Sequence, residues 1–160
     1  MPDTLIDILM AFLGAAGFAM VFNVHRGRRL FWTGVGGAAG WIVYLLALHQ
    51  SGSVFLAMFS ATAIIVFLSE VLARTIKVPI IMLMVPMLIP LIPGGSLYYT
   101  MDALVQGDSA TAAATAYSLA TQAGAIAVGI IVMTSIMGNF FTFYYRRKRR
   151  RTAPGGQTRK

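Results

Sequence analysis

The basic residues of this 160-residue chain fall into three short clusters that long apolar stretches separate. The clusters are Arg26, Arg28 and Arg29, then Arg74 and Lys77, and finally Arg146–Arg151 with Arg159 and Lys160. Residues 30–73 and 78–145 contain no Lys or Arg, and each range is long enough for two membrane-crossing helices of ~20 residues. Because Lys and Arg collect on the cytoplasmic side of membrane proteins, the clusters predict three returns of the chain to one face.

The composition is that of a membrane protein. Hydrophobic residues make up 58% of the chain and charged residues 11%, whereas a soluble domain carries roughly 25% charged residues. The net charge of +8 follows from the predicted topology, so we expect membrane lipid as a partner and no nucleic acid. The chain has no cysteine, and no metal-ligand spacing surrounds His25 or His49, so neither a metal nor another cofactor is expected.

The apolar runs predict an all-α, polytopic membrane helix bundle of about five transmembrane helices, with the N-terminus outside and the C-terminus in the cytoplasm. The predicted spans are Leu5–Val24, Leu30–Leu48, Val54–Leu72, Val78–Pro93 and Tyr117–Tyr145, with Gly94–Thr115 as an outer segment. Residues 1–146 are predicted to form a single transmembrane domain, and residues 147–160 a basic, disordered cytoplasmic tail. The alternative is a four-span bundle in which the first or the fourth run is re-entrant.

The apolar stretch before the basic tail is longer than one simple span. A single helix over residues 112–145 would be about 51 Å long, which exceeds a hydrocarbon core of ~30 Å. Either this helix projects outward, or it tilts, or the Ala-rich start at residues 111–116 forms a separate helix. The sequence leaves these three arrangements open.

Prolines and glycines interrupt the fourth run, at Pro86, Pro90, Pro93, Gly94 and Gly95. Each proline removes a backbone donor and clashes with the preceding turn, so a regular helix cannot continue. Broken backbone is tolerated in hydrocarbon only where protein or a water-filled cavity satisfies it, and broken helices mark substrate sites in secondary transporters. The free amides of residues 94–96, ending at Ser96, are therefore candidate ligands of a carboxylate. An ordinary helix end at the interface is the alternative.

Two carboxylates are candidates for ion coupling. Glu70 lies within or beside the third span, where a carboxylate suits a proton relay, but Arg74 follows at the spacing of a helical ion pair. Asp102 comes soon after the proline segment, and its spacing from Tyr98 and Tyr99 would place all three on one helix face. The alternatives are an interfacial salt bridge for Glu70 and simple solvation for Asp102.

Amides and small residues complete the set of candidate positions. Asn23 closes the first span, and Gln122 and Asn139 lie in the last, where each amide would either line a pathway or bridge helices; Asn23 would equally cap its helix. Small residues repeat every four positions at Gly36 and Gly40, and again at Ala116, Ala120 and Gly124. Such faces let helices approach closely, within one chain or between chains.

Two segments resemble a known family. Gly17–Val24 is similar to the first-span signature of the small subunit of the threonine/serine exporter family. The run Ile89–Ser96, with Tyr98 to Met101 after it, resembles the proline–glycine motif of that family, although Gly95 and Leu97–Tyr99 depart from its pattern. An apolar span followed at once by a basic tail also fits.

The resemblance implies a subunit of a secondary transporter in the bacterial inner membrane, one that exports threonine and serine or a dicarboxylate such as succinate. It implies a larger subunit of the same family as partner, with substrate contact or gating near Pro90, Pro93, Gly94 and Ser96 and with Asn23 nearby. We expect proton coupling and alternating access, and a homo-oligomer is a further expectation because five short spans enclose little space. The alternatives are a non-transporting subunit that stabilises a larger partner, and a homo-oligomeric channel.

An enzyme is not expected. No nucleophile elbow, P-loop, H-E-x-x-H motif or dinucleotide fingerprint occurs, so the sequence offers no catalytic residue.

Overall fold

The computed structural model describes residues 2–24 and 27–152, and every regular element in these ranges is helical. The elements are α1 (Pro2–Val21), α2 (Gly27–Ser51), α3 (Val54–Ile76), α4 (Ile81–Leu88), the 3₁₀ helix η1 (Ile89–Leu91), α5 (Gly94–Val105) and α6 (Ser109–Thr152). The predicted all-α helical bundle is confirmed. His25 and Arg26, in the predicted first loop, lie outside the described residues.

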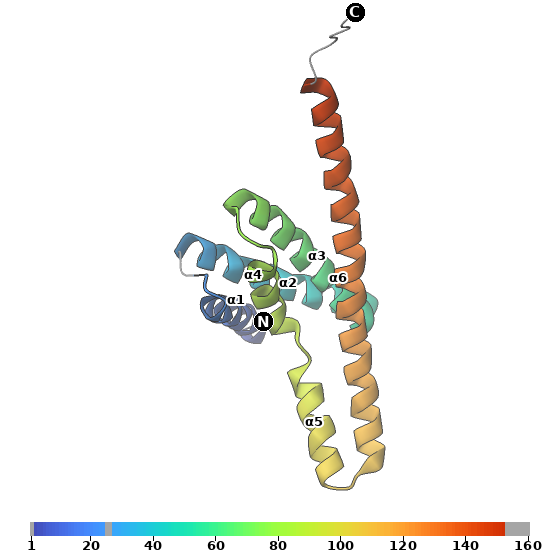
Figure 1. Cartoon of the computed structure of the whole chain (residues 1–160). Helices are drawn as coiled ribbons and strands as arrows, with labels where there is room; N and C mark the ends of the chain where they lie inside the picture. The colour runs from blue at the N-terminus through green and yellow to red at the C-terminus, as the bar shows by residue number, and fades with distance from the viewer. Residues whose placement is uncertain (1, 25–26, 153–160) are drawn as a thin grey trace, which may run out of the picture.

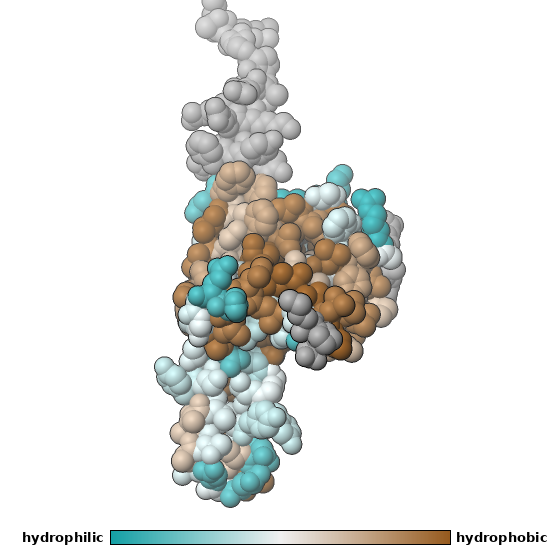
Figure 2. Space-filling model, turned by 180° about the vertical axis from the view of Figure 1, so that it is seen from behind, coloured by the Kyte–Doolittle hydropathy of each residue, from teal (hydrophilic) through white to brown (hydrophobic). Residues whose placement is uncertain are grey.

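The helices form a bundle from which one hairpin extends. Helices α1, α2, α3 and α4 pack against one another, and α6 runs along α3 (Figure 1). Beyond this contact, α5 and the first part of α6 form an antiparallel hairpin that points away from the bundle (Figure 1). In the view of Figure 2, this hairpin is the lower lobe, and it is much paler than the brown, apolar bundle above it.

Glycines on α2 bring three neighbouring helices into close contact. A Cβ atom added at Gly37 would lie 2.5 Å from the Cβ of Ala15 on α1, and one at Gly36 or Gly40 would collide with Met87 of α4 or Ile65 of α3. The predicted small-residue face of α2 therefore packs inside the chain. On α6, by contrast, a Cβ atom at Gly124 would meet nothing within 4 Å.

The structure contains four helices that are long and apolar enough to cross a membrane within the described ranges. The helices α4 and η1 together cover residues 81–91, about 16 Å, which is too short for a hydrocarbon core of ~30 Å. They become a fifth span only together with α5, to which they join at a bend of 56°. Whether the chain crosses the membrane four or five times therefore depends on the course of the proline-rich segment.

The long last helix is continuous. Helix α6 runs from Ser109 to Thr152, about 66 Å, so the Ala-rich start is part of it. Of the three arrangements that the sequence left open, a separate helix at residues 111–116 is excluded. The predicted outer segment, Gly94–Thr115, is the helical hairpin itself. The end of α6 lies inside the range predicted as a tail, and residues 153–160 lie outside the described residues.

The tip of the hairpin is fixed by capping at both helix ends. Helix α5 ends at Val105, and Gly107 follows with a φ of 76°, which suits a residue without a side chain. The N–H of Asp108 donates to the carbonyl of Ala103 at 3.0 Å. The carboxylate of Asp108 then caps α6 by accepting the backbone N–H of Thr111 at 3.1 Å. Hydrogen bonds from the hydroxyl and the backbone N–H of Thr111 lower the pKa of the Asp108 carboxyl below its usual value.

Candidate functional site

The break after α4 follows from the prolines. The N–H of Ile89 makes the last α-helical bond of α4, to the carbonyl of Val85, and Pro90 has no N–H with which to continue. One 3₁₀ turn follows, closed by the N–H of Ile92 on the carbonyl of Ile89 at 3.1 Å. Helix α5 begins only after Pro93, so the predicted interruption of the helix is confirmed.

The broken segment lies in the core of the bundle. Leu83, Met87 and Leu91 are almost wholly buried, and they pack in one cluster with residues of α3 and with Ala125 of α6. From Ile92 onward the chain emerges, since Ile92 and the two following glycines are exposed or half-exposed. The first part of the break, up to Leu91, therefore lies against protein, whereas the bend at residues 92–93 lies at the surface of the bundle.

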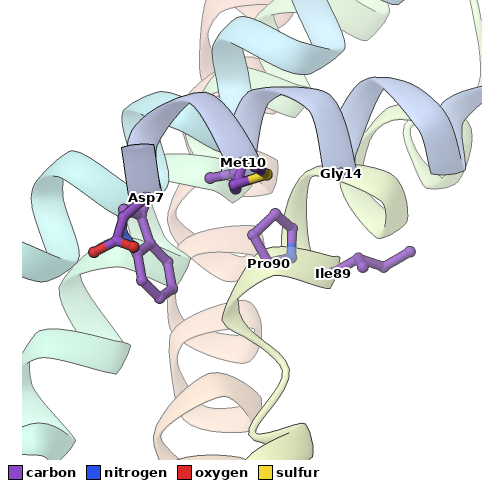
Figure 3. Close-up of a pocket in the computed structure, with 7 residues that line it drawn as sticks. Asp7, Met10, Gly14, Ile89 and Pro90 are labelled. Carbon is purple, nitrogen blue, oxygen red and sulfur yellow. The ribbon is translucent and has the colours of Figure 1, made fainter. Parts of the chain in front are cut away.

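A pocket of about 220 Å³ opens beside the break, between α1, α2 and η1 (Figure 3). It is lined by Asp7, Met10, Ala11 and Gly14 of α1, Trp41 of α2, and Ile89 and Pro90 of η1. The four α1 residues occur at positions i, i+3, i+4 and i+7, so they form one helix face. In Figure 3, Pro90 lies against this face below Met10, and Asp7 stands at one end of the pocket.

The pocket combines apolar walls with one carboxylate. Asp7 contributes an exposed carboxylate, and the indole N–H of Trp41 is buried without a hydrogen-bond partner among the described residues. Apolar pockets with a few placed polar groups are typical of small-molecule sites. Within the described ranges, no three His, Cys, Asp or Glu side chains gather to hold a metal ion.

A second polar cluster joins α5 to α6. The side-chain amide of Gln122 donates to the hydroxyl of Ser96 at 3.0 Å and to that of Ser118 at 2.9 Å. The hydroxyl of Thr100 donates to the carbonyl of Ser96 at 2.7 Å. The structure thus brings together two predicted site residues, Ser96 and Gln122, directly after the break.

A sequence model of the threonine/serine exporter family (Threonine/Serine exporter, ThrE) matches residues 7–136, which include the pocket and the break. The chain belongs to the threonine/serine exporter family. The resemblance found in the sequence is confirmed, and the chain is a multi-pass membrane protein of a family of transporters rather than enzymes.

One relative of this exporter-family chain is an uncharacterised protein of Haemophilus influenzae. The two are 35% identical over 106 residues, which are 66% of this chain and 35% of that protein. The chain therefore spans about a third of the length of the relative that it matches. No solved structure matches the chain.

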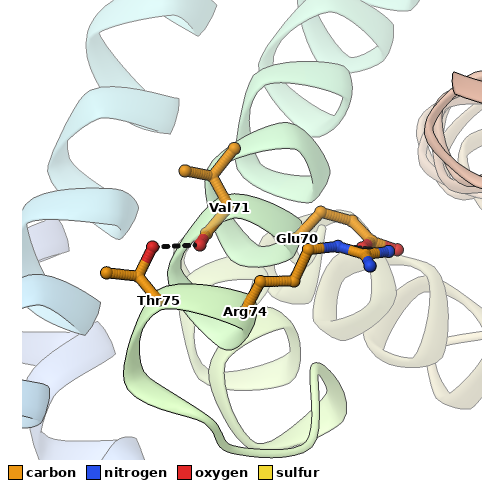
Figure 4. Close-up of polar contacts among 4 residues, drawn as sticks. All are labelled: Glu70, Val71, Arg74 and Thr75. Carbon is orange, nitrogen blue, oxygen red and sulfur yellow. Dashed lines mark hydrogen bonds and ion pairs between the residues drawn. The ribbon is translucent and has the colours of Figure 1, made fainter. Parts of the chain in front are cut away.

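The two predicted coupling carboxylates of the exporter chain lie away from the pocket. Glu70 forms an ion pair with Arg74 at 2.8 Å, and the guanidinium of Arg74 stacks over the ring of Phe141 on α6, 3.6 Å from its centroid. Figure 4 shows Glu70 and Arg74 on the side of α3 toward α6. Asp102 is exposed on the hairpin, where its carboxylate accepts a hydrogen bond from the side chain of Gln106 at 2.9 Å.

Of the backbone amides predicted to bind an anion at the start of α5, only some lack a hydrogen-bond partner within the helix. The N–H of Gly94 donates to the carbonyl of Ile92 at 2.7 Å, so the prediction of a free amide at Gly94 is wrong, because the chain turns sharply after Pro93. Gly95 and Ser96 lie in the first turn of α5, where amides have no partner within the helix and Pro93 offers no side-chain cap.

The remaining predicted residues lie at helix ends or on open surfaces. Asn23 ends α1 with a φ of 64°, its N–H donating to the carbonyl of Met20 at 3.1 Å, which is a capping geometry. Tyr98 and Tyr99 are exposed and meet edge to face, with ring centroids 5.5 Å apart. Asn139 is exposed on α6.

Sequence reasoning missed Asp7 and Trp41 as pocket residues. The spacing of the four α1 residues shows in the sequence that they share one helix face. The sequence does not show which helix packs against that face. Nothing in the sequence places Trp41 of α2 beside the break.

Proposed function

We propose that this chain is a subunit of a secondary transporter that exports small polar metabolites across the bacterial inner membrane. The observation that carries the proposal is the pocket at Pro90, because it places the carboxylate of Asp7 beside a broken helix. Discontinuous helices form the solute sites of many secondary transporters. Membership of the threonine/serine exporter family supports the same function.

The proposed orientation has the N-terminus outside and the C-terminus in the cytoplasm. Arg28 and Arg29 begin α2, and Arg74 and Lys77 lie at the end of α3, so both connections carry the basic residues typical of the cytoplasmic side. With the termini on opposite sides, α4, η1 and α5 together form the fifth crossing. The tip of the hairpin then points outward, which agrees with the pale, polar surface of the hairpin in Figure 2. Asp7 would lie in the outer half of the first span.

An amino acid fits the proposed pocket better than a dicarboxylate does. An amino acid carries an ammonium group, which the carboxylate of Asp7 would attract. A dicarboxylate such as succinate would be repelled by Asp7. We therefore propose threonine or serine as the solute. The amides of Gly95 and Ser96 are a second proposed contact for a carboxylate, one turn beyond the break.

We further propose that Asp7, rather than Glu70 or Asp102, couples export to the proton gradient. Glu70 is held by Arg74, and Asp102 lies on the hairpin, whereas Asp7 lines the pocket. A carboxylate within a span is a common proton carrier. Alternating access would come from rotation at residues 92–93, where no regular helix holds the backbone.

The proposed partner is a larger subunit of the same family, with or without further copies of this chain. The relative in Haemophilus influenzae is about three times as long as the part that matches, which supports a longer functional unit. One small bundle with an open pocket also encloses little space for a closed path.

The test is efflux of labelled threonine, serine and succinate from cells loaded with each solute. The chain is expressed alone and together with its candidate larger partner, and its insertion into the membrane is checked by fractionation. We expect threonine or serine efflux only with both chains. Efflux from this chain alone would instead support a homo-oligomeric transporter, and no efflux from either arrangement would support a non-transporting subunit.

Substitutions at the break test the role of the pocket in efflux independently of the stability of the bundle. Replacing Pro90 by alanine should lower efflux while the protein stays in the membrane, because the helix would regain a donor at the pocket wall. Wild-type efflux in this variant and in Gly94→Leu together would contradict the proposed site.

A further inference from the structure

A basic crevice lies between the first turns of α2 and the last turns of α3, apart from the pocket at Pro90. One part of it, of about 270 Å³, is lined by Arg28, Arg29, Thr75 and Ile76. A second part, of about 180 Å³, is lined by Arg28, Trp32, Leu72, Thr75 and Ile76. Because the two parts share three lining residues, we treat them as one space, the α2–α3 crevice.

The charge of the α2–α3 crevice is not neutralised by its own walls. Two arginines line it, and none of the described lining residues is acidic. Arg29 is held in place, since its Nη2 donates to the backbone carbonyl of Ile76 at 3.4 Å. The carboxylate of Glu70 is ion-paired with Arg74, and Figure 4 shows this pair on the side of α3 opposite Thr75. An anion is therefore the expected occupant.

The crevice is also amphipathic. Its arginine part is polar, whereas Trp32 and Leu72 give the adjoining part an apolar wall. Trp32 is 44% exposed, beside Phe31, which is 55% exposed, and their rings meet edge to face. Exposed tryptophan next to arginine is typical of the level at which lipid headgroups lie. A ligand with an anionic head and an apolar chain would match both parts.

We propose that the α2–α3 crevice binds an anionic phospholipid, with Arg28 and Arg29 on its phosphate and an acyl chain along Trp32 and Leu72. Guanidinium groups suit this role because their donors match the spacing of phosphate oxygens. Basic pockets between helices on the cytoplasmic side of a membrane bind such headgroups. The site is independent of the transported solute.

The experiment measures lipid binding to the purified full chain in detergent by native mass spectrometry. The probes are phosphatidylglycerol, phosphatidylcholine and inorganic phosphate. The variants are Arg28→Gln, which removes a charge from both parts of the crevice, and Trp32→Ala, which removes none. Lys77→Gln is the matched control, because it removes one charge at the same end of α3 but lines neither part of the crevice.

We expect phosphatidylglycerol to bind more tightly than phosphatidylcholine, and Arg28→Gln to weaken its binding about fivefold. Lys77→Gln should leave the binding almost unchanged, and Trp32→Ala should weaken it with every charge in place. Equal binding of the two lipids, or equal losses in Arg28→Gln and Lys77→Gln, would overturn the proposal. A third outcome would also overturn it: inorganic phosphate displaces the lipid, and Trp32→Ala has no effect on binding. The ligand would then be a free anion.

Discussion

The side-chain amide nitrogen of Gln122 on α6 lies 3.0 Å from the hydroxyl oxygen of Ser96 in the first turn of α5. This bond holds the chain directly after the break against the continuous helix. We expect Ser96→Ala and Gln122→Ala each to lower the thermal stability of the detergent-solubilised protein, with a coupling energy of about 0.6 kcal/mol in the double-mutant cycle.

The control for this cycle is Thr121→Ala. The hydroxyl of Thr121 bonds only to the carbonyl of Tyr117 in its own helix at 2.9 Å, so this change should show no coupling to Ser96→Ala. Purely additive effects of Ser96 and Gln122 would show that the bond contributes nothing to stability.

Asp7→Asn should abolish proton-coupled threonine or serine efflux while the protein still inserts into the membrane, because the amide cannot exchange a proton or attract an ammonium group. Efflux and membrane content are measured in the same cells. Asp108→Asn is the matched control, since it removes a carboxylate at the hairpin tip, where asparagine caps a helix equally well. Unchanged efflux in Asp7→Asn would remove this residue from the mechanism.

Gly37→Ala should destabilise the bundle. The new methyl group would lie 2.5 Å from the Cβ of Ala15 and 3.2 Å from the carbonyl oxygen of Ala11, and such overpacking costs about 1–3 kcal/mol. Gly17→Ala is the control, because nothing lies within 4 Å of its added methyl group and alanine favours the helix by ~1 kcal/mol. The measurement is the thermal unfolding midpoint of both variants in the same detergent. Equal midpoints would contradict the close approach of α1 and α2.

The hairpin tip should loosen in acid. Because the folded pKa of Asp108 lies below its unfolded value of ~3.9, its capping contribution is complete above that value and is lost as the pH falls through the folded pKa. Hydrogen exchange at residues 109–112, corrected for intrinsic rates, should therefore rise below about pH 4. In Asp108→Asn this added pH dependence should vanish, and its persistence would point to another group.

Glu70→Gln should retain efflux if the ion pair with Arg74 is structural. We expect only a small loss of stability, ~0.2–1 kcal/mol, because Arg74 is partly exposed. Arg74→Ala should cost more, since it also removes the stacking on Phe141. Loss of efflux in Glu70→Gln, with stability intact, would return Glu70 to the list of coupling carboxylates.

The sequence predicted those helices and breaks that a single local pattern determines. Apolar runs between basic clusters placed α1, α2 and α3, and Pro90 and Pro93 marked the break. Local chemistry decided these features, so no knowledge of the packing was needed. The spacing of Glu70 and Arg74 likewise predicted their ion pair.

The pocket was not predictable because it depends on which helices meet. No site role was predicted for Asp7, yet it shares a pocket with Pro90, far along the chain. The amide of Gly94 was misjudged because a turn of the backbone, rather than residue type, decides whether it is free. Contacts between distant segments carry no local pattern.

The unbroken course of α6 has a mechanical consequence. Its neighbour in the hairpin, α5, is joined to α4 through a bend, whereas α6 is a stiff rod from the hairpin tip to its contact with Arg74. A force that displaces the tip therefore bends the chain at residues 92–93, between η1 and α5, and tilts α6 as one piece. The ends of α5 and α6 that lie away from the tip would move by different amounts. A displacement of the tip at one side of the protein would therefore change the structure at the opposite side.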